Sequence, residues 1–365
     1  MNIMFISGSY PSIKCGVGDY SYNLVLNLSL KREIEKLVVL HSSERYNFEK
    51  SNKIKYLIIN NWYFLPFYKI LKIIKSEKID LIHIQYPSLV YKYSLSLHIF
   101  SLIIKLFLRI KIVITFHEFS QTHILRKIAE ILFIPLSDYL IFTNLYEQNY
   151  VSKIYKRVLN KSCVIKIGSN IPENHNENIE KENIICFFGL IRPNKGLEEF
   201  IELVRLASLK NYNMYKFVII GSPQSKTQKY YIQVRKFTKS LPVMWKTNLS
   251  PEEVSKELSK IKFAYLVYPD GVSERRTSFL ACLSHNILVF TNKGEQTADD
   301  LSDKVVFVNS TEEVLDKIKF YNNNSNEYEK VIKKAKEYIK EFSWSTIAES
   351  HINLYKKLLR SLKRF

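Results

Sequence analysis

Short apolar runs alternate with longer stretches of helical periodicity along the first half of the chain. The segments between the runs space their apolar residues at intervals of three and four, as amphipathic helices do. Continuous apolar runs bounded by turn residues are typical of strands that are buried on both faces of a parallel sheet. The pattern therefore predicts a doubly wound α/β domain with strands at 2–8, 36–42, 54–60, 80–86, 110–117, 139–144 and 163–168, and helices at 19–32, 66–77, 121–133 and 144–156.

A second alternating set follows a polar stretch in the middle of the chain. Residues 173–183, ENHNENIEKEN, have the composition of a linker. The apolar runs after it predict a second Rossmann-like domain with strands at 184–190, 215–222, 242–247, 263–269, 286–292 and 304–309. Ligands of such folds bind at the carboxyl ends of the strands. The expected site is therefore a cleft between the two domains.

Composition supports this interpretation and excludes other classes of protein. The 365 residues are 46% hydrophobic and 24% charged, which fits two folded α/β domains and not a disordered chain. Residues 1–10 lack a basic region before the apolar run and are interpreted as a first strand, not a signal peptide, so we expect a protein that is not exported. The cysteines Cys15, Cys163, Cys186 and Cys282 form no CxxC pair, so neither structural zinc nor a disulfide framework is predicted, and a reducing cytoplasm is expected.

The net charge of +19 calls for an explanation, and residues 1–170 hold 23 Lys and Arg against 11 Asp and Glu. The apolar stretch that starts at Leu95 is interrupted by Lys105, Arg109 and Lys111, which argues against a membrane span. It is either a basic amphipathic helix on an anionic membrane or a core helix with a solvated face. No nucleic-acid-binding motif accompanies the charge, so nucleic acid is not an expected partner.

The segment FFGLIRPNKGLEEF, residues 187–200, leads from a strand that ends at Gly189 into a helix that starts near Gly196. Such a turn directs unpaired backbone N–H groups and the positive end of a helix toward one point. Arg192 and Lys195 add two cations to it. The turn is suited to a phosphate or diphosphate, and the alternative is an ordinary surface turn. It lacks the GxxxxGK[ST] pattern of a Walker loop.

Two other loops have small residues where a ligand approaches the backbone. Residues 268–292 contain a Gly, Ser and Asp loop before a helix that opens near Thr277, which is a second candidate anion cradle. Glu274 in this loop is suited to accept hydroxyl groups of a ribose or sugar. Gly16 and Gly18 follow the first strand, where the lack of a Cβ permits close approach, but the GxGxxG dinucleotide pattern is absent.

In order and spacing, these motifs resemble the retaining glycosyltransferases of family 4, which have the two-domain GT-B fold. The resemblance covers nearly the whole chain, through the Gly16–Gly18 loop, TFHE at 115–118, the 187–200 segment, VIIGS at 218–222, the 269–274 loop and the closing segment 342–359. It implies an acceptor-side domain at 1–170 and a nucleotide-sugar-binding domain at 171–343. It also implies that a final helix, 344–365, packs back on the first domain.

The resemblance implies a catalytic set of His117, Arg192, Lys195 and Glu274. Arg192 and Lys195 would bind the donor diphosphate and stabilise the leaving group, His117 would contact a hydroxyl of the donor sugar, and Gly16 and Gly18 would line the phosphates. The other donor-binding positions are Gly189, Gly221, Asn248, Asp270, Gly271, Val272, Ser273 and Thr277, with the base held near 244–248. Transfer with retention would need no metal and no cofactor, because the two cations stabilise the leaving group electrostatically. The departing phosphate would help to deprotonate the acceptor.

The expected function is transfer of a sugar from a nucleotide-sugar donor to a growing glycan, with a lipid-linked surface glycan as the favoured acceptor. The basic first domain favours a cytoplasmic enzyme in peripheral contact with the inner face of the plasma membrane. The family's second loop glutamate is replaced near Ala281, and Arg192 stands three residues after Gly189 instead of directly after it. The alternatives are a nucleotide-sugar epimerase of the same fold and a non-catalytic partner of another transferase.

The remaining candidate residues have structural interpretations beside the functional ones. His83, at an expected strand end, is favoured as a core histidine, and Cys282 and His285 as packing residues. Arg275 and Arg276 either bind phosphate or acceptor or face solvent. Glu118, next to His117, is a candidate acceptor-site base.

Overall fold

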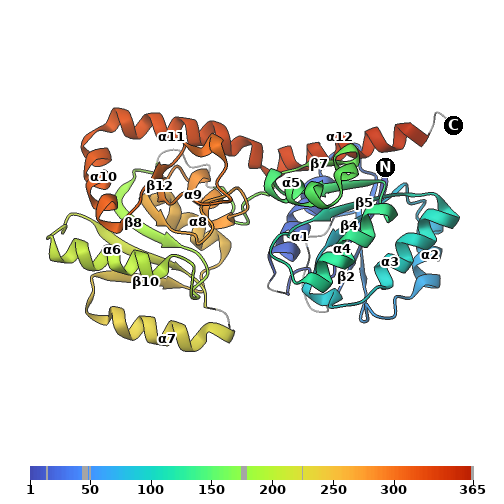
Figure 1. The fold of residues 1–365 in the computed structure, drawn as a ribbon, viewed down its shortest axis with the longest axis horizontal. Coiled ribbons are helices and arrows are strands. Elements are labelled where there is room, and N and C mark those ends of the chain that lie inside the picture. The colour runs from blue at the N-terminus through green and yellow to red at the C-terminus, as the bar shows by residue number, and fades with distance from the viewer. Residues whose placement is uncertain (14, 43–47, 49–50, 174–178, 224, 363–365) are drawn as a thin grey trace. The chain divides into compact units, whose positions relative to one another are not determined.

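The chain folds into two compact units (Figure 1), which are described separately. Unit 1 comprises Met1–Gly168 and Trp344–Phe365, and unit 2 comprises Ser169–Ser343. The structure is a computed structural model, and it describes all residues except 14, 43–47, 49–50, 174–178, 224 and 363–365.

Unit 1 is built on a parallel sheet of seven strands in the order β3-β2-β1-β4-β5-β6-β7. The strands are β1 (Asn2–Ile6), β2 (Lys36–His41), β3 (Ile54–Ile58), β4 (Leu81–Tyr86), β5 (Lys111–Phe116), β6 (Tyr139–Phe142) and β7 (Ser162–Val164). All but β7 lie within a run predicted from the sequence, and β7 starts one residue before its predicted run, 163–168, and ends at Val164. The predicted doubly wound sheet is confirmed. The chain order reverses between β1 and β4, so the loops that follow these two strands flank the crevice where such sheets bind ligands.

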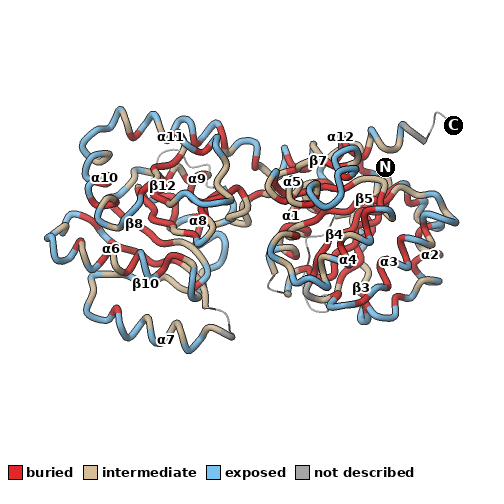
Figure 2. Tube along the Cα trace, in the orientation of Figure 1, coloured by how far each residue is buried: buried red, intermediate tan, exposed pale blue. Residues whose placement is uncertain are grey.

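Helices cover both faces of this sheet because alternate side chains of each strand enter two separate cores. Ile3 and Phe5 of β1 pack in one core with α1 (Gly16–Ser29) and α12 (Trp344–Leu362). Met4 and Ile6 pack in the other core with α2 (Phe67–Ser76), α3 (Ser96–Ile103) and α4 (Ile124–Leu136). Figure 2 shows the strands buried between these helices. The last helix of the chain thus completes a face of the first sheet.

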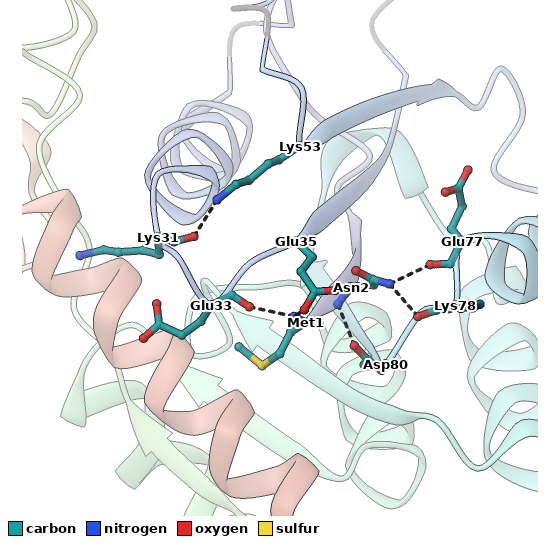
Figure 3. A network of polar contacts seen from close by, with 9 residues as sticks. All are labelled: Met1, Asn2, Lys31, Glu33, Glu35, Lys53, Glu77, Lys78 and Asp80. Carbon is teal, nitrogen blue, oxygen red and sulfur yellow. Dashed lines mark hydrogen bonds and ion pairs between the residues drawn. The ribbon is translucent and has the colours of Figure 1, made fainter.

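Polar contacts close the amino ends of the central strands (Figure 3), at the edge of the sheet opposite the ligand crevice. The amino group of Met1 donates to the carbonyl of Glu33 at 2.8 Å, and the backbone N–H of Asn2 donates to the Asp80 carboxylate at 2.8 Å. The Asn2 amide also donates to the carbonyls of Glu77 and Lys78 at 3.1 and 3.2 Å. These bonds satisfy backbone groups that the strand ends would otherwise leave unpaired.

Unit 2 repeats the design with six parallel strands in the order β10-β9-β8-β11-β12-β13. They are β8 (Glu182–Phe188), β9 (Lys216–Gly221), β10 (Val243–Thr247), β11 (Ile261–Leu266), β12 (Leu288–Thr291) and β13 (Val306–Phe307). The helices are α6 (Leu197–Leu209), α7 (Gln228–Phe237), α8 (Pro251–Lys260), α9 (Thr277–Ser284), α10 (Thr311–Asn323) and α11 (Ser325–Ile339). Here the order reverses between β8 and β11, which again defines the ligand crevice.

The structure corrects some boundaries. The predicted linker 173–183 lies partly outside the described residues, at 174–178, and its last two residues belong to β8, because the exposed start of this strand tolerates polar side chains. The helix predicted at 19–32 runs from Gly16 to Ser29. The stretch from Leu95 is not one helix: α3 continues as a π-helical segment, Ile104–Leu108, and the left-handed Arg109 turns the chain toward β5.

The described residues form neither a membrane span nor a metal cluster. Among them, no helix has the length and apolarity that a membrane span requires. The same residues contain no cluster of three or more His, Cys, Asp or Glu side chains placed to hold a metal ion. The four cysteines are free thiols.

One buried acid stands out in unit 1. Glu130, on α4, is fully buried, and neither of its carboxylate oxygens has a hydrogen-bond partner among the described residues. Burial, and to a smaller extent the Glu147 carboxylate, raises the pKa of Glu130 from an ordinary 4.5 to about 9. Glu130 is therefore protonated in the folded protein at neutral pH, because an unpaired charge there would be costly.

Glu130 makes unit 1 less stable as the pH rises. The folded state holds its proton up to about pH 9 and the unfolded state releases it near pH 4.5, so stability is lost between these values by at most about 1.4 kcal/mol per pH unit. Glu130→Gln removes this dependence. We expect its free energy of unfolding to equal that of wild type near pH 4 and to exceed it by a few kcal/mol at pH 8, in urea denaturation. A constant difference at both pH values would contradict the assignment.

Candidate functional site

The loops that follow β8 and β11 lie against each other in unit 2. Gly196, before α6, has a positive φ of 81°, and a Cβ at this position would lie 2.5 Å from the backbone oxygen of Val267, directly after β11. A side chain is therefore excluded by both conformation and space. The two predicted anion cradles thus meet at the reversal point of one sheet.

Beneath these loops, the carboxyl ends of β8 and β9 also lie close together. The backbone N–H of Gly189 donates to the carbonyl of Ile220 at 3.1 Å, and that of Ile191 donates to the carbonyl of Ser222 at 3.2 Å, which extends the contact between β8 and β9 into the loop. A Cβ on Gly221 would lie 2.0 Å from the Gly189 carbonyl oxygen. The lack of a side chain at Gly221 therefore permits the close packing of the strand ends.

Arg192 and Lys195 are both half-buried in the loop after β8. The Nε of Arg192 is buried and has no hydrogen-bond partner among the described residues. A buried donor without an acceptor costs about 1–3 kcal/mol, and more when it is charged. An anionic ligand with oxygen acceptors would supply what this guanidinium lacks.

The loop after β11 is held by hydrogen bonds within the loop and to Asn292. The backbone N–H of Gly271 donates to the carbonyl of Tyr268 at 3.0 Å, and that of Val272 donates to the carbonyl of Asn292 at 3.2 Å. The Asn292 side chain bonds both backbone groups of Tyr268, at 2.9 and 2.8 Å. Gly271 and Val272 therefore use their N–H groups to hold the loop. Asn292, which the sequence did not single out, clamps it.

Two donors of this loop are buried and unsatisfied. Ser273 is 4% exposed, and its hydroxyl has no partner among the described residues. Arg276 bonds the Asp270 carboxylate and lies over the Tyr268 ring, 5.0 Å from its centre, while its Nε has no described partner. The solvent-facing alternative for Arg276 is therefore wrong, because Asp270 and Tyr268 hold it inside the loop.

Glu274, Thr277 and Asn248 complete the predicted positions of unit 2. Glu274 is 9% exposed, and Thr277 is exposed at the first position of α9, whose N-cap has no side-chain hydrogen bond. Ala281 lies one turn later and is fully buried. Asn248 is exposed after β10 in a left-handed conformation, and its N–H donates to the Gly221 carbonyl at 3.3 Å.

In unit 1, the loops after β1 and β4 are joined at the corresponding crevice. The backbone N–H of Gly8 donates to the Tyr91 hydroxyl at 2.8 Å. A Cβ on Gly18 would lie 3.1 Å from the backbone nitrogen of Tyr10, so this glycine lets the loop after β1 pack on α1. Gly16 is exposed, and apart from its chain neighbours and the backbone of its own helix no described atom lies within 4 Å of its Cβ position. Of the two, Gly16 leaves open space for a ligand.

His117 follows β5 and is half-buried. Its Nε2 donates to Gln85 Oε1 at 2.7 Å, and its ring contacts Tyr20 edge to face with centres 4.8 Å apart. Burial, with a smaller contribution from His351, lowers the pKa of His117 to about 3. The imidazole is therefore neutral and acts as a hydrogen-bonding group, not as a cation. Glu118 lies beside it, half-buried.

The loop that carries His117 is held by an acid from α5 (Leu145–Ile154), the helix that follows β6. Glu147, on α5, accepts the backbone N–H groups of Phe119 and Ser120 at 2.9 Å each. The sequence pattern had not marked Glu147, whose partners lie 27 and 28 residues away.

The packing interpretations of the other candidates are correct. Cys282 and His285 are buried, and both ring nitrogens of His285 have hydrogen-bond partners within the protein. His83 is also a fully buried, hydrogen-bonded core residue, but it lies in the middle of β4 and not at its end.

Substitution by alanine should reduce stability by different amounts at Gly189 and Gly221, the glycines at the two strand ends. Gly221→Ala would drive a Cβ into the backbone of Gly189, whereas Gly189→Ala would meet only the Phe187 ring, at 3.3 Å. We expect Gly221→Ala to destabilise unit 2 by about 2 kcal/mol or more and Gly189→Ala by less than about 1 kcal/mol. Thermal unfolding of both variants measures this difference. Equal losses would contradict the close packing described here.

Comparisons with known proteins identify the fold. No protein-family model matches this chain, and no curated protein matches its sequence. Solved structures do match. A glycosyltransferase from Rickettsia africae is 14% identical with a TM-score of 0.73, over 98% of each chain. Sucrose-phosphate synthase from Thermosynechococcus elongatus is 13% identical with a TM-score of 0.72, over 99% of this chain and 100% of that one.

HepE from Anabaena, in complex with UDP and glucose, is 12% identical with a TM-score of 0.70, over 98% of this chain and 100% of that one. The similar structures are GT-B glycosyltransferases, most of them retaining enzymes of family 4. Together with the two parallel sheets, they show that this chain has the GT-B fold.

Proposed function

We propose that the protein is a retaining glycosyltransferase that uses a nucleotide-sugar donor. The observation that carries this proposal is the set of buried donors that have no partner in the described part of the chain, Arg192 Nε, Ser273 Oγ and Arg276 Nε, on the two loops that meet at the crevice of unit 2. A diphosphate has the oxygen acceptors and the negative charge that such donors require. HepE, which shares the fold, has been crystallised with UDP-glucose, so a UDP-sugar is the first donor to test.

In this proposal Arg192 and Lys195 stabilise the charge that develops on the departing diphosphate. They do so electrostatically, without a metal or a covalent intermediate. Glu274 accepts hydroxyl groups of the donor, and the Met244–Asn248 segment lies along the base. His117 contacts a hydroxyl of the transferred sugar, and Gly16 leaves room for the phosphates. The acceptor attacks on the face that the leaving group departs from, and a phosphate oxygen takes its proton.

Removal of the cations tests the diphosphate assignment. We expect Arg192→Ala or Lys195→Ala to lower the rate of transfer by about 10²-fold, as the loss of a charge-stabilising donor does, with little change in Tm. The assay measures release of nucleoside diphosphate from a panel of UDP-, GDP-, ADP- and dTDP-sugars. Arg205→Ala is the matched control, because Arg205 is an exposed arginine of unit 2 paired with Glu202. A fully active double variant of Arg192 and Lys195 would refute the assignment.

The same panel separates the two alternatives. A nucleotide-sugar epimerase would change the sugar without releasing nucleoside diphosphate and without needing an acceptor. A non-catalytic partner protein would show no thermal shift with any donor. Release of one nucleoside diphosphate that is accelerated by an acceptor supports the transferase.

We further propose that the acceptor is a growing, lipid-linked glycan at the inner face of the plasma membrane. Apolar side chains are exposed on α3, on the π-helical segment after it and on α4, and α3 packs on α4 through the His98 bond to the Ala129 carbonyl at 2.8 Å. This α3–α4 surface consists of Ile99, Leu102, Leu106, Phe107, Ile124, Leu125, Ile128 and Leu132. Lys105 and Arg109 are exposed beside it. Apolar and basic groups together suit an anionic bilayer.

Phe107 tests this membrane contact, because it is the most exposed member of the α3–α4 surface, at 76%. We expect Phe107→Ser to reduce co-sedimentation with phosphatidylglycerol vesicles several-fold, since about 25 cal/mol of burial energy is lost per Å² of apolar area. Phe237→Ser on α7, with a side chain that is 70% exposed, is the control in unit 2. Equal binding of both variants, or equal binding to phosphatidylcholine, would count against the proposal.

A further inference from the structure

A line of hydrogen bonds joins the C-terminal helix to His117 inside unit 1. The Tyr355 hydroxyl, on α12, lies 2.6 Å from Nδ1 of His83 on β4. His83 Nε2 is 3.1 Å from the amide nitrogen of Gln85, and the amide oxygen of Gln85 is 2.7 Å from His117 Nε2. Tyr355, His83 and Gln85 are fully buried, whereas His117 is half-buried. The line therefore starts in the core and ends at the group that we assign to the donor sugar.

The side-chain amide of Gln85 gives this line a direction, because its oxygen only accepts and its nitrogen only donates. His117 must then carry its proton on Nε2, and His83 must accept the Gln85 amide proton on Nε2, which the Thr115 hydroxyl oxygen also approaches at 2.7 Å. The proton of His83 is consequently on Nδ1 and is donated to the Tyr355 oxygen. Burial lowers the pKa of both histidines, so both are neutral.

We propose that Tyr355 is a positioning residue for His117, acting through His83 and Gln85. The line holds His117 in the tautomer that leaves Nδ1 without a proton and able to accept a hydrogen bond from a sugar hydroxyl. This inference rests on the proposed function, since the contact of His117 with the sugar is part of it. Tyr355 itself touches no substrate and is not a catalytic residue.

A neighbouring tyrosine provides a matched control. Tyr20, on α1, is 4% exposed, and its hydroxyl also bonds α12, at 3.3 Å from His351 Nε2. This hydroxyl is not part of the line of hydrogen bonds that runs through His83 and Gln85 to His117. Tyr20→Phe therefore removes a similar buried contact between α12 and the rest of unit 1 and keeps the ring that packs on His117.

The test combines NMR with kinetics on the full chain. In protein labelled with ¹⁵N at histidine, we expect wild type to carry the proton of His117 on Nε2 and that of His83 on Nδ1. Tyr355→Phe should populate both tautomers of each ring and lower kcat for sugar transfer about five- to tenfold, the effect of one hydrogen bond. UDP binding, measured without sugar, should be unchanged in this variant. Tyr20→Phe should leave the tautomers and kcat as in wild type.

Three results would overturn the proposal. They are a wild-type His83 that is protonated on Nε2, a folded Tyr355→Phe variant with unchanged His117 tautomer and kcat, and equal effects of the two tyrosine variants. If Tyr355→Phe does not fold, the tautomers of His83 and His117 in wild type still test the proposal. If wild type turns over no nucleotide sugar, the proposed function fails, and the NMR result separately reports whether the line exists.

Discussion

The pairing of β8 with β11 is the constraint on which the candidate site depends. These strands are neighbours in the sheet, although β9 and β10 separate them in the sequence. After β8 the chain continues toward one side of the sheet, to β9 and β10, and after β11 it continues toward the other side, to β12 and β13. Only there can a loop rich in cations and a loop rich in small donors converge without a helix between them. The glycine contact between Gly196 and Val267 is the local consequence of that pairing.

The line of His83 and Gln85 in unit 1 and the crevice loops of unit 2 treat buried polar groups in opposite ways. In unit 1, His83 and Gln85 find partners on every side, and such a satisfied network favours one arrangement of side chains over others. In unit 2, Arg192 and Ser273 are held in the protein with donors that no described atom satisfies. A protein that leaves donors unsatisfied sacrifices stability at that position, which is common at binding sites and rare elsewhere.

The sheets and the loops of unit 2 were predictable from the sequence because their signals are local. Apolar runs mark buried strands, and a strand, glycine and helix in succession locate the loops at the carboxyl edge of the sheet. Gln85 and Tyr355 carried no such signal: the partner of Tyr355 lies 272 residues away, and only the docking of α12 brings the two together. The sequence does not determine the exposure of Arg276 for a related reason, because that exposure depends on the loop conformation that places Asp270 against it.

The position of α12 in the chain also bears on how the protein is made. Unit 1 consists of the first 168 residues together with a helix that begins at Trp344, so the ribosome synthesises all of unit 2 before the last piece of unit 1 exists. Until then, one face of the first sheet lacks a helix that packs on it, and the core around Ile3 and Phe5 is incomplete. The nascent chain therefore holds a partly covered apolar sheet while unit 2 folds, which is the kind of surface that chaperones bind.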